Sequence, residues 1–207
     1  MPQYKLTYFN LRGLAEAIRC CLHYGGIEFE DRRVLKGEWA ELKPKTPNGT
    51  VPLFEVDGKM LTQSGAILRY VSRLTGLTGK DSWEEAKADE TFHYFIDALT
   101  KDAGPYIWDK AGIFKAADID AAYKAFVPAA TKHLTYYSKM LDEAGNGYLL
   151  KSGLTYADFV VYSHALTLRN VDPELAKQFP KVYEFVERIE KLPQLQEYLK
   201  IRPNSVN

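Results

Sequence analysis

The 207-residue sequence predicts an α+β domain at its amino-terminal end, followed by an all-α helical domain. Residues 1–75 alternate between strand and helix patterns, whereas the segments after residue 82 show helical periodicity. Between the two parts lies a stretch rich in Thr and Gly, the composition of a linker. We therefore predict one domain over residues 1–75, a linker over 76–81 and a helical domain over 82–207.

The first domain is expected to open with a strand, a helix and a second strand. Residues 4–9 (YKLTYF) are rich in β-branched and aromatic side chains, which suit a sheet. Residues 15–24 carry apolar side chains on one helical face and end at a glycine pair, so they predict a helix. Apolar residues at alternate positions predict the second strand over 27–31.

The remainder of this domain is expected to hold a hairpin between two helices. A short helix is predicted over 38–43. Two apolar runs, 51–56 and 59–61, flank Asp57-Gly58, and this dipeptide is the strongest short signal for a hairpin turn. Residues 66–74 then place apolar side chains on one helical face. The order β-α-β followed by β-β-α is that of a thioredoxin-like domain.

Two long helices are predicted at the start of the second domain, over 82–109 and 119–144. The second contains Pro128 near its middle, and we expect a kink there because proline lacks the amide and crowds the preceding turn.

Capping signals predict the later helices. Thr155 and Asp158 have the spacing of a capping box before an apolar run, so Asp158 is expected to cap a buried helix. Pro180 and Pro193 are expected to open two further short helices.

Composition argues against several classes of function. Formal net charge is zero, so no excess of basic charge favours nucleic acid or an anionic membrane as a partner. No apolar run reaches the roughly 20 residues of a membrane span, and we expect no signal peptide. Cys20 and Cys21 are adjacent and are expected to be free thiols, which indicates the cytoplasm. The four histidines have no ligand spacing, so we assign no metal.

Tyr8 is the first candidate functional residue, because it lies where the first strand ends and a helix is about to begin. A phenol at that junction faces the positive end of the helix dipole and the free amides of the first turn, where an anion is favoured. The phenol is neutral near pH 7 and can donate a hydrogen bond to that anion. Arg12 and Glu16, four residues apart in the same region, are interpreted as a structural ion pair.

Three further sites of the first domain could converge with Tyr8. Trp39 and Lys43 are four residues apart, so an indole donor and an ammonium share a helix face. Pro52 is out of place inside a strand unless it starts the strand or follows a cis bond. A cis Val51-Pro52 bond would leave the backbone of Val51 free to pair with an extended peptide ligand.

Gln63 and Ser64 precede the last helix of the domain, where their side chains and the helix amides can bind a carboxylate. Together with Tyr8 and Val51, they predict a site for a small anionic peptide with a thiol or another soft group near the phenol.

At these motifs the chain resembles the cytosolic glutathione S-transferases of the sigma class, including nematode-type members and glutathione-dependent prostaglandin D synthases. The resemblance covers essentially the whole chain and rests on several separated motifs in the right order, namely YFNLRGLAE, TPNGTVPLFEVDG, LTQSGAILRYV and TYADF. It implies an enzyme that uses glutathione as cosubstrate and no metal. It also implies a homodimer.

The resemblance implies a role for each matching residue. Tyr8 would be catalytic and would donate its hydroxyl to the glutathione sulfur. The glutathione-binding residues would be Trp39 and Lys43 for the glycyl carboxylate, Val51 for the cysteinyl backbone, and Gln63 with Ser64 for the γ-glutamyl carboxylate. Asp97, in the first long helix of the second domain, would reach the γ-glutamyl amine in the neighbouring subunit.

The expected reaction is conjugation of glutathione to small apolar electrophiles, as in detoxification. Chain position suggests four residues for the electrophile pocket: Phe9, Leu14, Leu99 and Tyr106. Leu14 stands where sigma-class synthases carry arginine, which disfavours a prostaglandin isomerase more than a transferase. A carrier of haem or other apolar ligands with weak catalysis, and a structural protein, are the other two classes; an intact Tyr8 site disfavours the structural protein.

Overall fold

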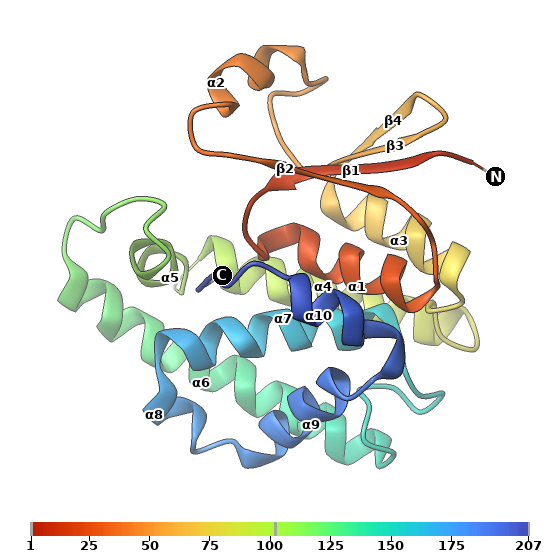
Figure 1. Cartoon of the computed structure of the whole chain (residues 1–207). Coiled ribbons are helices and arrows are strands. Elements are labelled where there is room, and N and C mark those ends of the chain that lie inside the picture. Colours follow the sequence, from red (N-terminus) through yellow and green to blue (C-terminus); the bar gives the residue numbers. More distant parts are fainter. Residues whose placement is uncertain (1, 102, 207) are drawn as a thin grey trace.

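A computed structural model describes residues 2–101 and 103–206. The amino-terminal part of the fold is a four-stranded sheet in the order β2-β1-β3-β4 (Figure 1). Strand β1 pairs in parallel with β2 and antiparallel with β3, which also pairs antiparallel with β4. The strands span Tyr4–Phe9 (β1), Glu30–Val34 (β2), Leu53–Val56 (β3) and Lys59–Thr62 (β4).

Helices α1 and α3 lie between this sheet and the helical body, whereas the short helix α2 lies beyond the opposite face (Figure 1). Their bounds are Glu16–Tyr24 (α1), Trp39–Leu42 (α2) and Ser64–Thr75 (α3). Two 3₁₀ turns, Gly13–Ala15 and Lys43–Lys45, adjoin α1 and α2. This arrangement confirms the predicted thioredoxin-like α+β part.

The rest of the chain is helical, which confirms the second half of the predicted fold class. Helix α7 is its core, because its residues from Tyr156 to Leu168 are all buried and it packs on α1, α4 and α9. None of the helices in the described chain is long and apolar enough to cross a membrane. The bounds are Ser82–Thr100 (α4), Gly104–Lys110 (α5), Ile119–Ala144 (α6), Tyr156–Val171 (α7), Pro173–Ala176 (α8), Pro180–Glu190 (α9), Pro193–Leu195 (a 3₁₀ turn) and Gln196–Ile201 (α10).

The prediction of the second strand over 27–31 was wrong in position. Strand β2 begins at Glu30, where its pairing with β1 starts. The paired residues run from Lys5 and Glu30 to Phe9 and Val34. Phe29 packs instead on the ring of His23 in α1, with ring centroids 5.2 Å apart. The alternating apolar side chains therefore belong to the turn between helix and strand.

The prediction of one helix over 82–109 was also wrong, because α4 ends at Thr100 and α5 begins at Gly104. Pro105 lies in the first turn of α5, where its missing amide costs nothing. The two helices approach so closely that a Cβ on Gly104 would lie 2.3 Å from the carbonyl oxygen of Leu99. The second long helix was predicted correctly, because α6 spans Ile119–Ala144 with Pro128 inside it.

The capping box at the start of α7 is confirmed. The Asp158 carboxylate accepts the amide of Thr155 at 2.7 Å and that of Leu149 at 2.9 Å, so it ties the preceding loop to the helix. The predicted turn at Asp57-Gly58 is present too, and both residues have positive φ (49° and 78°), as a two-residue hairpin turn requires.

The predicted ion pair between Arg12 and Glu16 is replaced by other contacts. The Glu16 carboxylate accepts from Arg202 Nη1 at 2.9 Å and lies 3.8 Å from Arg19 Nη1. Arg12 instead donates to Thr167 Oγ1 at 3.3 Å and to the Val206 carbonyl at 2.5 Å. These partners lie in α7 and the C-terminal tail, far away in sequence, so helical spacing cannot predict them.

Candidate active site

Tyr8 lies at the carboxyl end of β1, and the following loop folds back onto its hydroxyl. The Leu14 amide donates to Tyr8 Oη at 3.2 Å, and the Tyr8 side chain is almost fully buried. Gly13 allows this approach, because its φ is +43° and a Cβ there would lie 2.6 Å from Tyr8 Oη. Since the backbone supplies one donor to the oxygen, the hydroxyl proton remains free to be donated to a ligand.

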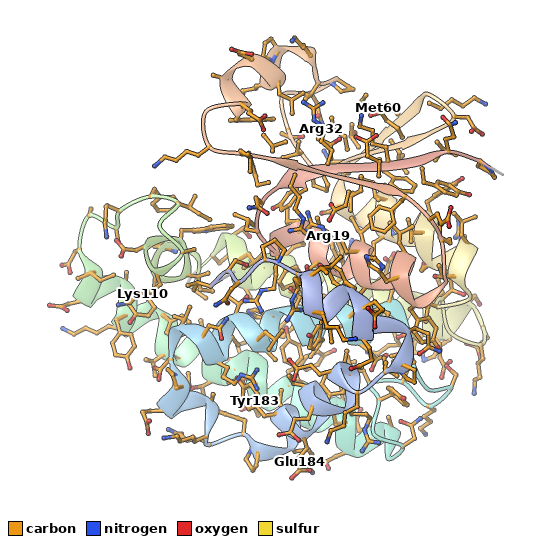
Figure 2. The ribbon with its side chains drawn as sticks, viewed as in Figure 1. Arg19, Arg32, Met60, Lys110, Tyr183 and Glu184 are labelled. Atoms are coloured by element: carbon orange, nitrogen blue, oxygen red, sulfur yellow. The ribbon has the colours of Figure 1, made fainter. Side chains whose placement is uncertain are left out.

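Arg19 supports this loop, and the sequence analysis did not identify it. Its buried guanidinium lies between the sheet and the helical body (Figure 2). It donates to the Leu11 carbonyl at 2.8 Å and lies 5.9 Å from the centre of the Tyr8 ring. Burial raises the pKa of Tyr8, while the Leu14 amide and the Arg19 charge lower that pKa. The phenol therefore stays protonated at neutral pH and acts as a donor.

The amino-terminal end of α3 forms the second half of the site. Gln63 precedes the helix with φ 71° and ψ 114°, a conformation that a non-glycine residue rarely adopts. Ile67 is the first residue whose amide bonds back to the Gln63 carbonyl, and the amides of residues 64–66 have no partner in the described chain. Three free amides and the helix dipole point to a carboxylate site.

A cavity of about 550 Å³ extends from this helix end toward Leu14 and the carboxyl-terminal half of α4. It brings together four of the residues named from sequence: Leu14, Gln63, Ser64 and Leu99. The other lining residues were not assigned to a site from sequence, because α3 and α4 meet only through tertiary packing. These residues are Gly65, Ala66, Arg69, Phe92, His93, Ile96, Thr100 and Trp108.

The residues expected to bind the peptide backbone and glycyl end lie on the other side of Tyr8. Trp39 is half-buried and packs edge-on against Phe9, with centroids 5.3 Å apart, while Lys43 is exposed. The Val51-Pro52 peptide is cis, as expected. The amide and carbonyl of Val51 have no hydrogen-bond partner among the residues described.

Seven of the eleven residues named from sequence lie outside the cavity lining, and Tyr106 and Asp97 are among them. Tyr106 packs on Phe126 with ring centroids 4.9 Å apart, so it is part of the helical core. Asp97 is half-exposed and pairs with Lys101, the residue after the end of its helix, at 2.9 Å.

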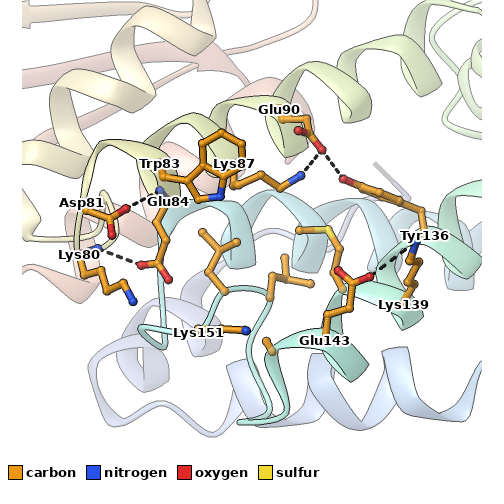
Figure 3. Close-up of a pocket in the computed structure, with 14 residues that line it drawn as sticks. Lys80, Asp81, Trp83, Glu84, Lys87, Glu90, Tyr136, Lys139, Glu143 and Lys151 are labelled. Atoms are coloured by element: carbon orange, nitrogen blue, oxygen red, sulfur yellow. Dashed lines mark hydrogen bonds and ion pairs between the residues drawn. The ribbon is translucent and has the colours of Figure 1, made fainter.

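A separate cavity of about 440 Å³ lies between the start of α4, α6 and residues 149–151 (Figure 3). Several of its charged groups are already paired: Glu90 accepts from Lys87 and Tyr136, and Glu143 lies 3.6 Å from Lys139. It contains none of the residues predicted for the site. Within the described residues, no group of three or more His, Cys, Asp or Glu side chains could hold a metal ion.

Two family models match the chain. The glutathione S-transferase N-terminal domain matches residues 4–73, and the glutathione S-transferase C-terminal domain matches residues 114–202.

Relatives that align over nearly their whole length are also named glutathione S-transferases. The chain is 40% identical over 204 residues to a probable glutathione S-transferase 7 of Caenorhabditis elegans, covering 98% of each chain. It is 38% identical over 206 residues to glutathione S-transferase 1 of Ascaris suum, covering 99% of each. The solved structure of NaGST-2 superposes with a TM-score of 0.92 at 35% identity over the full length of both chains.

Other solved structures differ in class, assembly or activity. A Nu-class enzyme from Haemonchus contortus is 39% identical with a TM-score of 0.87, covering 100% of both chains. A monomeric glutathione S-transferase from Necator americanus is 33% identical with a TM-score of 0.89, covering 98% of each. A prostaglandin synthase D of Nilaparvata lugens is 28% identical with a TM-score of 0.85, covering 98% of this chain and 100% of its own.

Proposed function

This chain belongs to the glutathione S-transferase family, and from that premise we propose that it conjugates glutathione to small apolar electrophiles with Tyr8 as the catalytic residue. The observation that carries the proposal is the bond from the Leu14 amide to Tyr8 Oη, which leaves the phenol proton free for the sulfur. A panel of electrophiles assayed at constant glutathione tests it. If the protein turns over none of these electrophiles, the proposal is wrong.

The chemistry follows from the pKa of the thiol. A free thiol with a pKa near 8.5 is only a few per cent thiolate at neutral pH. A phenol that donates to the sulfur stabilises the charged form, and the dipole of the adjacent helix adds to this. A decrease of about two pKa units, roughly 2.7 kcal/mol, would make the thiolate dominant at pH 7. The thiolate then attacks the electrophile directly, with no covalent intermediate on the protein.

We assign the rest of the glutathione by the chemistry of each part. The γ-glutamyl carboxylate is placed at Gln63, Ser64 and the free amides of α3. The unpaired backbone of Val51 suits the cysteinyl residue, while Trp39 and Lys43 suit the glycyl carboxylate.

The electrophile is placed in the apolar end of the cavity, where Leu14 and Leu99 lie. Phe9 and Tyr106 do not line the cavity and stay in the proposed pocket on chain position alone. Leu14 supports an apolar electrophile, because it carries no charge toward the sulfur.

The likeness to a prostaglandin synthase D supports a second candidate, a glutathione-dependent prostaglandin isomerase. Leu14, in place of the arginine of sigma-class synthases, favours the transferase. We propose the sigma class for this chain on its motifs. Titration of haem and other apolar ligands beside the conjugation assay separates an enzyme from a carrier.

We also propose a division into a glutathione-binding domain over 1–75 and a helical domain over 82–207. Helix α3 ends at Thr75 and α4 begins at Ser82, which supports the linker between them. Cys20 and Cys21 are buried free thiols, which supports the cytoplasm as the location.

Gln63→Ala and Ser64→Ala are expected to raise KM for glutathione and to leave kcat close to wild type. These residues hold a carboxylate whose charge does not change during the reaction, so they bind ground state and transition state equally. Steady-state kinetics with glutathione varied measures the effect. A fall in kcat at constant KM would place them in the chemistry instead.

We propose a homodimer in which Asp97 binds the γ-glutamyl amine of the neighbouring site. The exposure of Asp97 and its absence from the cavity of its own chain support this assignment. Asp97→Asn is expected to weaken glutathione binding roughly tenfold, since losing a partly exposed charge partner costs less than the ~2–5 kcal/mol of a buried one. Calorimetric titration with glutathione measures it.

Mixing Tyr8→Phe chains with Asp97→Asn chains gives the sharper test. One site of the heterodimer then combines an intact Tyr8 with an intact Asp97 from the other chain. Only that site turns over rapidly, so the KM for glutathione of the heterodimer should be near that of the wild type, whereas an Asp97 that acts within its own chain would leave the raised KM of Asp97→Asn. Because a similar glutathione S-transferase from Necator americanus is monomeric, the oligomeric state of this protein should be measured first. A monomer at working concentration, or verified heterodimers that restore nothing, would rule out the shared site.

A further inference from the structure

A third cavity, of about 310 Å³, lies beneath the C-terminal tail, between the start of the chain's first loop, the end of α7 and α10. Three arginines line it, Arg12, Arg169 and Arg202, against a single carboxylate, Glu190. It shares no lining residue with the cavity of the proposed glutathione site.

The arginines are unequally compensated. Arg202 Nη1 lies 2.9 Å from the Glu16 carboxylate behind it. Arg169 Nη2 lies 3.9 Å from Glu190, at the outer limit of an ion pair. Arg12 is 4% exposed and has no carboxylate partner in the described chain. Buried charges in proteins are almost always paired, so the positive charge of Arg12 lacks its usual compensation.

The hydrogen bonds of Arg12 are also incomplete. Its Nη2 donates to the Val206 carbonyl and to Thr167, but its Nε is buried with no partner among the described residues. Burial lowers the pKa of Arg12, and the Arg202 charge lowers it further while Glu16 raises it. A buried donor without a partner is rare in native proteins, where a ligand or water usually satisfies it.

We propose that this cavity binds a phosphate group, either free phosphate or the phosphate of a small ester, held by Arg12, Arg169 and Arg202. Planar guanidinium groups bind such oxyanions through paired, charge-assisted hydrogen bonds. A phosphate there would supply the missing negative charge. It would also connect the first loop and α7 to the tail, which already receives hydrogen bonds from Arg12 and Asn170 through its carbonyls.

Calorimetric titration of the full-length protein with inorganic phosphate, at constant ionic strength and with saturating glutathione, tests this. The glutathione keeps phosphate from the amides at the start of α3. We expect one phosphate per chain, and about three- to tenfold weaker binding in Arg169→Gln, the loss expected for one partly exposed charged contact. Glu190→Gln should bind several-fold more tightly, because it removes the one carboxylate of the lining.

Arg73→Gln is the matched control, since Arg73 is an exposed arginine paired with Glu85 on α4 and should leave binding unchanged. Arg169 is preferred to Arg12 as the tested residue because it is partly exposed and its loss should not disturb folding. Repeating the titration with glycerol 3-phosphate separates the two sources: tighter binding indicates an ester, and equal binding indicates free phosphate. No binding by the wild type, or equal affinities in Arg169→Gln and Arg73→Gln, would overturn the proposal.

Discussion

Tyr8→Phe is expected to lower kcat for conjugation about 100-fold while the fold and the affinity for glutathione stay close to wild type. The change deletes one hydroxyl, and that hydroxyl interacts more strongly with the thiolate than with the thiol. The packing of the ring against Phe9 is unaffected, with centroids 5.5 Å apart in the wild type. Stopped-flow or steady-state kinetics measures the rate.

The same variant should raise the pKa of the bound thiol, which is measured by the ultraviolet absorbance of the thiolate as pH is varied. Tyr4→Phe is the matched control, because Tyr4 lies on the same strand and packs on Phe54, away from the Leu14 amide. A Tyr8→Phe enzyme with wild-type rate and an unchanged bound-thiol pKa would show that Tyr8 only packs.

Tyr8 could be identified from the sequence, whereas the contact of Arg19 with the Tyr8 loop could not. Tyr8 belongs to a local pattern, a strand followed by a helix start, and that pattern is visible in nine consecutive letters. Arg19 contributes through a contact with the Leu11 carbonyl and a charge near the Tyr8 ring. A cationic residue between Ile18 and Cys20 on a buried helix was the available signal, since such a charge needs a partner.

Local chemistry explains which parts of the fold could be predicted. The turn at Asp57-Gly58 and the cap at Asp158 depend on residues close in sequence, and both are present. The start of β2 depends on its register with β1, and the end of α4 depends on how closely Gly104 approaches Leu99. The register of β2 is a tertiary contact, which sequence patterns do not contain. The end of α4 is set locally, by Gly104 and Pro105 in the first turn of α5, and this local signal was missed.

The same distinction holds for the cavity. Gln63 and Ser64 were identified from a helix start, which is a local feature, whereas His93, Ile96 and Thr100 enter the lining only because α4 packs beside α3. Helical periodicity indicates that one face of α4 is buried, but it cannot say which ligand or helix that face meets.

Two buried histidines make the helical domain sensitive to acid. His164 receives or donates a hydrogen bond with Tyr137 Oη at 2.8 Å through Nδ1, and its Nε2 is buried without a partner in the described chain. His133, 5.5 Å away between ring centroids, has an unpartnered Nδ1 beside Tyr94 and Lys132. Burial lowers the pKa of His164 to about 3 and that of His133 to about 4.

The sign of the effect follows from these values. The unfolded chain binds a proton at each imidazole below a pKa near 6.5, whereas the folded protein keeps both neutral until about pH 4. Their contribution to stability is therefore complete above pH 6.5 and is lost as pH falls. Asp158 has the opposite sign, since burial raises its pKa to about 7 and the folded state takes up a proton there. The change of the unfolding free energy of the wild type with pH is the sum of these contributions. A variant is therefore needed to isolate the contribution of the histidines.

His164→Gln is expected to remove one of the two acid-sensitive groups while its side chain can still pair with Tyr137. Between pH 7 and pH 5.5 the wild type should lose about 1 to 1.5 kcal/mol more stability than this variant, the amount that protonating one imidazole in the unfolded chain provides. Urea unfolding at a fixed protein concentration and several pH values measures the difference. His93→Gln, at an exposed position, should keep the wild-type slope. If His164→Gln keeps it as well, the buried imidazole is not the source of the acid sensitivity.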